Sequence, residues 1–554
     1  MVDEKKMRTG GQILVDQLVL QGVDRGYCVP GESYLAVLDA LFDTGIELIT
    51  CRHEGGASMM AEAYGKLMNK PGICFVTRGP GLVNAMSGIH IAMQDSTPLI
   101  VFVGQINTQM REREAFQEIN YRALLSDHVK WVTEIDNAER IPEIIGRAFH
   151  IAMSGRPGPV VIALPEDMLI TNAQVLDANK ILPVAISPSL NDMVRFEHLL
   201  SSASNPIMIL GGGNWSAESV SRVEKFAAKN MLPVAVELRR QMLFSTEHET
   251  FVGDVGLGIN PYLEDRIKKA DLVILLGGRF SETPSQGYQL LNVPVSKQTL
   301  IHIHADINEL NRVYQPDLAI NADPEAFTKA LLLLKVKNTW PCIVQKDRAA
   351  YLAWRDTRDI KLPGKLQLGE VMAFLSQSLS SDAILTNGAG NFATWVHRFY
   401  HFRAFGTQLA PTSGTMGYGV PAAIAAKQLY PDKMVICFAG DGDFMMTGEE
   451  FATAVQYEIP IIVIILDNSM FGTIRMHQEM HYPKRAIGTS LNNPDFAAYA
   501  KAFGGLGFHV ETTGEFFNAW EQAIAQEKPT IIHCILDPEA MTPNKTLTEI
   551  SQKL

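Results

Sequence analysis

The sequence predicts an α/β protein with three doubly wound parallel-sheet domains. Its 554 residues are too many for one hydrophobic core. Domains typically contain roughly 150 residues or more, so a chain of this length favours three domains. Short apolar runs alternate with helical stretches along the chain, and these runs are continuous, which indicates strands covered by helices on both faces of parallel sheets. The runs span residues 73–77, 99–104, 159–164, 206–211, 271–277, 434–440 and 459–466.

Two stretches interrupt this alternation and are expected to be connections between domains. Residues 166–190 are polar and then proline-bearing, and residues 335–366 contain two further prolines. The domains are therefore expected at residues 1–165, 190–330 and 366–545.

Composition and charge exclude several classes of protein. No apolar run approaches the roughly 18 residues that span a bilayer, and the charged first ten residues do not resemble a secretory signal, so we expect a cytoplasmic protein with no membrane partner. The net charge of −12, without basic runs, argues against a nucleic-acid partner. The six cysteines contain no C-x-x-C pair and are expected to be reduced and mostly buried.

Polar segments follow two of the predicted strands in the third domain. One strand ends at Gly440 and leads into residues 441–443, and the next leads into Asp467 and Asn468. Ligands of open parallel sheets bind at the carboxyl ends of strands. If these strands are neighbours, Asp441 and Asn468 lie side by side and offer the oxygen ligands that suit Mg²⁺.

The residues around this pair are suited to a phosphate-bearing ligand. Gly442 allows backbone amides to approach phosphate oxygens. Thr447 and Glu450 are expected to form a capping box that starts the intervening helix. Taken alone, each polar segment is also typical of a tight turn.

The combination of Gly440-Asp441-Gly442-Asp443 with Asn468-Ser469-Met470-Phe471-Gly472, 25 residues later, resembles the diphosphate motif of thiamine diphosphate (ThDP) enzymes. Along nearly its whole length the chain is similar to the acetolactate synthase and pyruvate oxidase group of this family. The resemblance implies ThDP and Mg²⁺ as cofactors. It also implies that Asp441 and Asn468 bind the metal through side chains and Met470 through its backbone carbonyl, with Asp443 in the cofactor cradle.

Two further segments of the third domain resemble the family. Residues 386–392, with Asn387 and Gly388, resemble a second diphosphate-contacting loop. Residues 412–423 resemble the segment in which the residue matching Met416 forces the cofactor into a V shape, while the carbonyl matching Gly414 binds its 4′-amino group. That shape brings the amine against the reactive thiazolium carbon. By itself Met416 is typical of a core residue.

The first domain is expected to supply the activating carboxylate. Glu54 is predicted at a strand-to-helix junction and matches the family's activating glutamate, which protonates the pyrimidine ring of ThDP. A carboxyl with a raised pKa suits this task. The family often has glutamine where Gly55 stands. Residues 29–33, with Gly31, resemble the loop that covers the reaction centre.

Several residues resemble the substrate channel of acetolactate synthases. Phe116 and Gln117 match an A-F-Q-E motif at 115–118, and Gln94 and Lys130 match residues on the substrate side. His477 stands where the family has a tryptophan that restricts the second substrate. Without the resemblance, Phe116 is typical of core, Lys130 of surface, and His477 and His481 of exposed helix positions.

The second domain departs from the family at the segments that hold FAD in acetolactate synthases. A glycine triplet, 211–213, follows its first predicted strand, but residues 277–288 keep only one of the two expected arginines and residues 234–256 do not match the flavin-facing loops. FAD is therefore doubtful here, and the domain is expected to keep its fold without it.

The resemblance implies decarboxylation of a small-molecule 2-oxo acid, followed by carboligation onto a second oxo acid. The alternatives are a non-ligating decarboxylase, a lyase acting on another oxo acid or a 2-hydroxyacyl thioester, and a catalytically silent binding subunit. The family also implies a homodimer or a dimer of dimers with shared active sites, and leaves open whether a regulatory subunit joins it.

Overall fold

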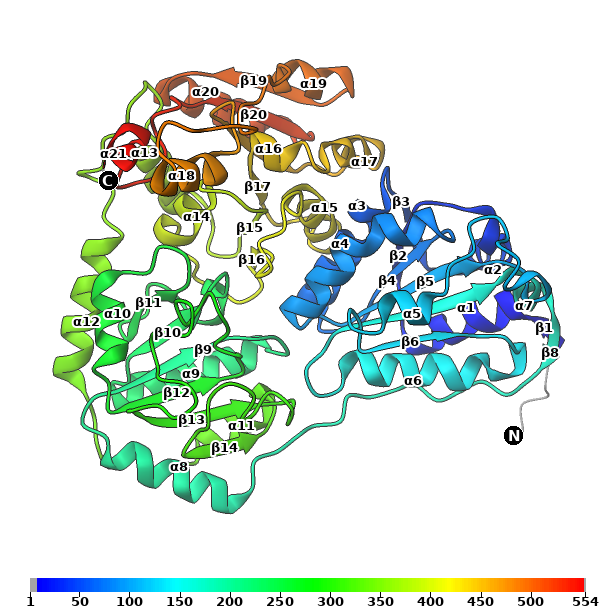
Figure 1. The fold of residues 1–554 in the computed structure, drawn as a ribbon, viewed down its shortest axis with the longest axis horizontal. Coiled ribbons are helices and arrows are strands. Elements are labelled where there is room, and N and C mark those ends of the chain that lie inside the picture. Colours follow the sequence, from blue (N-terminus) through cyan, green and yellow to red (C-terminus); the bar gives the residue numbers. More distant parts are fainter. Residues whose placement is uncertain (1–6, 553–554) are drawn as a thin grey trace. The chain divides into compact units, whose positions relative to one another are not determined.

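The computed structural model describes residues 7–552 and contains three six-stranded sheets in which all neighbouring strands are parallel (Figure 1). Helices connect the strands and cover the sheets, as the continuous apolar runs predict. The predicted fold class is therefore confirmed. The chain forms two compact units. Within the described residues, one comprises residues up to 184 with 424–429, and the other comprises residues 185–423 and those from 430 onward.

The first unit is built on a sheet with the strand order β3-β2-β4-β5-β7-β6. Its strands are β2 (Arg25–Cys28), β3 (Glu47–Thr50), β4 (Gly72–Val76), β5 (Leu99–Gln105), β6 (Trp131–Glu134) and β7 (Pro159–Pro165). Its principal helices are α1 (Gly10–Gln21), α2 (Leu35–Phe42), α3 (Glu54–Met68), α4 (Pro80–Asp95) and α6 (Ile141–Met153). A short antiparallel pair of β1 (Met7–Thr9) and β8 (Asn172–Gln174) lies outside this sheet.

The middle sheet has the order β11-β10-β9-β12-β13-β14. Its strands are β9 (Pro206–Leu210), β10 (Val234–Glu237), β11 (Phe251–Val255), β12 (Leu272–Leu276), β13 (Thr299–His304) and β14 (Leu318–Asn321). The helices around it are α8 (Leu190–Ser202), α9 (Ala217–Asn230), α10 (Pro261–Lys268) and α11 (Pro324–Leu331).

The third sheet has the order β16-β15-β17-β18-β20-β19 and belongs to the same unit as the middle sheet. Its strands are β15 (Ile384–Asn387), β16 (Gln408–Leu409), β17 (Val435–Gly440), β18 (Ile462–Asp467), β19 (Leu506–Val510) and β20 (Thr530–Ile535). Its helices include α13 (Leu368–Ser378), α14 (Ala393–Phe399), α15 (Gly419–Leu429), α16 (Asp441–Phe444), α17 (Phe451–Gln456), α18 (Gly472–His481), α19 (Phe496–Ala502) and α20 (Thr513–Gln526).

The two stretches interpreted as plain connections contain secondary structure. Residues 335–366 include the helix α12 (Pro341–Trp354), and residues 166–190 include the helix α7 (Glu166–Ile170) and the strand β8. Pro341 lies in the first turn of α12, where proline is tolerated because that N–H needs no helical partner. The ring of Tyr351 packs edge-on against Phe251 with 5.0 Å between centroids, so burial fixes a helix that local sequence did not indicate.

Two expectations about the whole chain can be compared with the described residues. No helix within residues 7–552 combines the length and the apolar character needed to cross a bilayer. None of the six cysteines in this range forms a disulfide, and all except Cys342 are buried.

Candidate cofactor site

The carboxyl ends of β17 and β18 lie side by side, because the two strands pair in parallel with Gly440 opposite Leu466. This pairing brings Asp441 and Asn468 to the same edge of the sheet. Both line a cavity of about 880 Å³ within the second unit, together with Gly442, Asp443, Met470 and His477. The condition for placing Asp441 beside Asn468, that these strands are neighbours, is therefore met.

Asp441 is buried and belongs to a pair of carboxylates held by one amide. Asn493 Nδ2 donates to Asp441 Oδ2 at 2.7 Å and to Asp467 Oδ1 at 2.9 Å. Burial and the neighbouring Asp467 charge raise the pKa of Asp441 above its usual value. Burial opposes ionisation of Asp467, but a hydrogen bond with His533 Nε2 at 3.0 Å helps to hold its pKa below the usual value.

A cation bound at Asp441 would offset the cost of a buried negative charge there. The side-chain oxygens of Asp441 and Asn468 and a backbone carbonyl form the oxygen-rich donor set that Mg²⁺ prefers. The residues present therefore fit a hard divalent ion at the edge of the cavity.

Asp443 ties together two loops that border the cavity. Its Oδ1 accepts the backbone N–H of Ala389 at 3.0 Å and that of Gly417 at 2.9 Å, whereas Oδ2 is buried without a hydrogen-bond partner. Burial raises its pKa to about 7. Asp443 thus fixes the 387–390 loop against the 414–417 loop.

Gly388 and Gly442 are glycines for steric reasons. A Cβ on Gly388 would lie 2.0 Å from Asp443 Oδ1, and one on Gly442 would lie 2.6 Å from the ring of Phe471. Asn387 is fully buried, with its Oδ1 3.0 Å from His397 Nε2. Asn387 therefore supports the loop from beneath.

The segment carrying Gly414 and Met416 also borders the cavity. Gly414 has a φ of +68°, which favours glycine. Met416 is half-buried, so part of its side chain is available to a ligand in the cavity.

The expected capping box at Thr447 and Glu450 is wrong. The Thr447 hydroxyl donates to the carbonyl of Gly417, and Glu450 Oε2 accepts from the hydroxyl of Thr453 at 2.6 Å. A helical turn does begin at the expected place, because Thr447 is the N-cap of the 3₁₀ turn Gly448–Glu450 that leads into α17. The Thr447 side chain does not cap that turn and instead fixes the 414–417 loop. The long-range bond to Gly417 outcompetes the local cap, and no local pattern signals it.

His477 lies on α18 and lines the cavity. His477 and His481 are both exposed, and their rings are parallel with 6.2 Å between centroids. The same wall carries Met470, Met476, Met480 and Met541, an adaptable apolar surface.

In the first unit, Glu54 begins helix α3 after β3, at the predicted junction. Its side chain is buried, and its Oε2 accepts a hydrogen bond from Asn84 Nδ2 at 3.0 Å. A Cβ on Gly55 would lie 2.9 Å from His53 Nδ1, so the glycine leaves room for the His53 cap of this helix.

Arg78 organises the loops that surround Gly31. It donates to Glu32 Oε1 at 2.8 Å and to Gln117 Oε1 at 3.4 Å, and its guanidinium carbon lies 5.9 Å from the ring centroid of Phe116. Gly31 contacts the 77–78 loop, because a Cβ there would lie 2.5 Å from Thr77 Cβ. The structure thus brings Gly31, Phe116 and Gln117 together.

Phe116 is 73% exposed, which contradicts its interpretation as a core residue. The surrounding loop is held by Glu118, whose carboxylate accepts the N–H groups of Glu112 at 2.7 Å and Ala115 at 3.0 Å. These bonds lower the pKa of Glu118. Gln117, within this loop, has a φ of +65°.

Two of the predicted channel residues lie apart from this group of loops. The Lys130 ammonium donates to the carbonyls of Ile151 at 2.5 Å and Ser154 at 2.6 Å, at the C-terminal end of α6. A cation there stabilises the helix end. Gln94 is the penultimate residue of α4 and is half-buried.

Sequence patterns alone did not identify Asn493, Asn84 or Arg78. Each acts on a predicted site residue through a contact between segments far apart in the chain.

Comparisons with known proteins find matches in all three domains. Three family models match: the N-terminal binding domain of thiamine pyrophosphate enzymes (thiamine pyrophosphate is another name for ThDP) over residues 8–124, the central domain over 195–331 and the C-terminal binding domain over 388–534.

Curated relatives match nearly end to end. The acetolactate synthase large subunit of Lactococcus lactis subsp. lactis (strain IL1403) is 32% identical, over 90% of this chain and 88% of its own length. The acetolactate synthase isozyme 2 large subunit of Escherichia coli (strain K12) is 28% identical, over 98% of this chain and 100% of its own. The probable acetolactate synthase large subunit of Methanocaldococcus jannaschii is 29% identical, over 98% and 95%.

The N-terminal match contains Glu54, the C-terminal match contains Asp441 and Asn468, and the relatives cover both. The chain therefore belongs to the thiamine pyrophosphate enzyme family and is an acetolactate synthase-like, ThDP-dependent enzyme.

Proposed function

We propose that this enzyme decarboxylates a 2-oxo acid and joins the remaining fragment to a second oxo acid, with ThDP and Mg²⁺ as cofactors. The observation that carries the proposal is the placement of Asp441 and Asn468 on adjacent strand ends, in one cavity with Gly414 and Met416. The relatives named as acetolactate synthase large subunits support this chemistry.

Asp441 and Asn468 would bind Mg²⁺ through side-chain oxygens, and Met470 through its backbone carbonyl. The metal neutralises a diphosphate beside an acidic strand end, in a protein with a net charge of −12. Asn387 and Gly388 would border the diphosphate. Asp443 would hold the 387–390 loop against the 414–417 loop through its bonds to Ala389 and Gly417.

When bound, ThDP supplies a carbon nucleophile and stores the electron pair left by CO₂. Met416 would impose the V shape and Gly414 would accept a hydrogen bond from the 4′-amino group. Glu54 would hold a proton at pyrimidine N1′, with its carboxyl oriented by Asn84. Burial of Glu54 excludes water from that proton.

Phe116 and Gln117 would contact the substrate, and His477 would line its path beside the cofactor. Arg78 supports this arrangement, since it holds Gln117 and lies against Phe116. Lys130, by contrast, is held at the end of α6, so we propose that it supports the fold instead of contacting substrate.

We further propose a homodimer or dimer of dimers in which Glu54 of one chain acts with Asp441 of its partner, as in the family. The domain limits at 1–165, 190–330 and 366–545, and a cytoplasmic location, belong to the same proposal.

The products formed from defined oxo acids test the activity. The purified protein is incubated with ThDP, Mg²⁺ and single or paired 2-oxo acids, and the products are identified by mass spectrometry. We expect a 2-hydroxy-2-alkyl-3-oxo acid from pyruvate-like substrates. If an aldehyde is the only product, the enzyme is a simple decarboxylase and the carboligation step is wrong. No turnover of any oxo acid would contradict the whole proposal.

A further inference from the structure

The middle domain has the strand order of a dinucleotide-binding fold. Its order β11-β10-β9-β12-β13-β14 reverses between β9 and β12, and ligands of such sheets bind in the crevice at the carboxyl ends of the two strands where the order reverses. In this fold a pyrophosphate lies against the glycine turn after the first strand and the N-terminus of the next helix. Here the glycine turn is 211–213, between β9 and α9.

The Glu237 carboxylate occupies this crevice. A Cβ on Gly211 would lie 2.1 Å from Glu237 Oε2, and a Cβ on Gly278 would lie 2.4 Å from Oε1. The two glycines follow β9 and β12, so the carboxylate lies between the ends of the strands at which the order reverses. Because glycine has no side chain, both positions leave room for the Glu237 carboxylate.

Two backbone N–H groups at this crevice are bonded to Glu237. Phe280 N donates to Glu237 Oε1 at 2.7 Å, and Gly212 also donates its backbone N–H to the carboxylate. Burial raises the pKa of Glu237, while these two bonds and the charges of Arg279 and Arg240 act in the opposite direction. Arg279 is the one arginine retained from the family's pair, and here its charge compensates an internal carboxylate.

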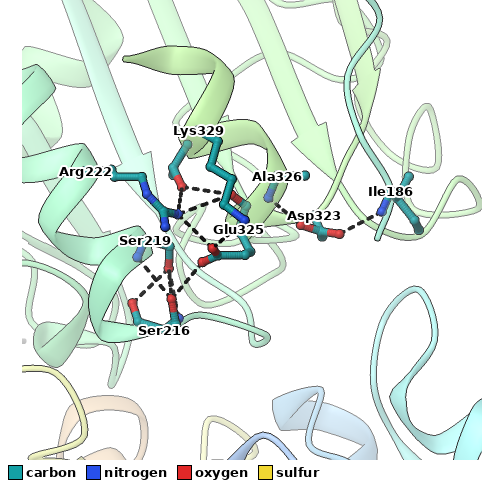
Figure 2. Close-up of polar contacts among 9 residues, drawn as sticks. Ile186, Ser216, Ser219, Arg222, Asp323, Glu325, Ala326 and Lys329 are labelled. Atoms are coloured by element: carbon teal, nitrogen blue, oxygen red, sulfur yellow. Dashed lines mark hydrogen bonds and ion pairs between the residues drawn. The ribbon is translucent and has the colours of Figure 1, made fainter. Parts of the chain in front are cut away.

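The N-terminus of α9 also has hydrogen-bond partners within the chain (Figure 2). Ser216 caps the helix by accepting from Ser219 N at 3.1 Å, and its hydroxyl lies 2.8 Å from Glu325 Oε2. Arg222 Nη1 binds the other oxygen of Glu325 at 2.9 Å. A second carboxylate therefore lies beside the N-cap residue of α9.

We infer that Glu237 is an internal anion held at the pyrophosphate position of the middle domain, so that this domain does not take FAD or another nucleotide diphosphate. A phosphate entering the crevice would overlap the carboxylate and be repelled by it. The domain keeps the dinucleotide-binding fold, but the anion in its crevice is the carboxylate of its own Glu237. The inference does not depend on the proposed activity.

The test uses wild-type enzyme saturated with ThDP and Mg²⁺, so that the catalytic cavity is already filled. FAD and ADP are titrated by calorimetry into wild type and into Glu237→Ala, and the apparent Tm is recorded with each ligand. Glu224→Ala is the matched control, because Glu224 is a middle-domain glutamate that accepts one backbone N–H, from Ser245 at 3.0 Å, away from the crevice.

We expect no binding of FAD or ADP to wild type or to Glu224→Ala. Glu237→Ala should have an apparent Tm lower by roughly 2–8 °C, because two charge-assisted bonds are lost, and ADP should restore part of that loss. Stoichiometric binding of FAD to wild type would overturn the inference, as would a folded Glu237→Ala that gains no affinity for ADP. If Glu237→Ala does not fold, the wild-type titration still decides whether the crevice is closed.

Discussion

Asn493 Nδ2 lies 2.7 Å from Asp441 Oδ2, and the same amide nitrogen reaches Asp467 Oδ1 at 2.9 Å. Two adjacent carboxylates at the end of neighbouring strands are thus separated and oriented by one neutral donor. The arrangement leaves Asp441 facing the cavity, where a cation would be its natural counter-charge.

Replacing Asp441 with alanine should lower ThDP affinity by more than about tenfold at fixed Mg²⁺, because a charged metal ligand is lost beside a diphosphate in an acidic protein. Calorimetric titration of ThDP measures this directly. Unchanged affinity would remove Asp441 from the metal site.

Asn493→Ala should weaken ThDP and Mg²⁺ binding about three- to tenfold, less than Asp441→Ala, since a ligand loses its orientation while its charge remains. Asn492→Ala, at the exposed neighbouring residue, is the control and should bind as wild type does. Equal effects of the two variants would show that Asn493 does not position the ligand.

The pH dependence of stability should report on Asp254 in β11. Burial raises its pKa from 3.8 to about 7, so the native state holds this proton more tightly than the unfolded chain does. Stability should therefore fall as pH rises between these two values, by at most about 1.4 kcal/mol per pH unit.

Asp254→Asn does not titrate, so its apparent Tm should rise relative to wild type as pH increases from about 4 to 7 and then stay constant. The exposed Asp432, changed to asparagine, controls for general charge effects. A difference between Asp254→Asn and wild type that does not change with pH would contradict the raised pKa.

The sharing of active sites between chains predicts complementation. Glu54→Ala and Asp441→Ala should each be inactive. In a mixed dimer, one site receives both defects and the other receives neither. With random pairing of co-expressed chains, activity should return to roughly a quarter of wild type. Verified mixed dimers without activity would mean that each chain completes its own site.

The sequence was sufficient to predict the features of the fold and site that depend on local pattern. Continuous apolar runs predicted β17 and β18 and parallel sheets, whereas the structure shows that these two strands are neighbours. That pairing placed Asp441 beside Asn468. The polar residues after each strand were visible without the structure.

Long-range contacts account for what the sequence did not predict. Asn493 is 52 positions from Asp441 in a loop with no periodicity, and Glu237 meets a backbone N–H 43 positions away. The Thr447 and Glu450 pattern indicated a cap, yet Thr447 binds the distant Gly417. Helix α12 was missed because its proline and polar residues resemble a linker, and its packing on the middle domain was not visible.

Release of CO₂ from a 2-oxo acid tests the central claim most directly. Wild type should release CO₂ from 1-labelled pyruvate or a related acid only when ThDP and Mg²⁺ are both present. Glu54→Gln should lower that rate about 100-fold or more, because a carboxamide cannot hold the proton at N1′. Release that continues without ThDP, or a Glu54→Gln enzyme as fast as wild type, would contradict the account.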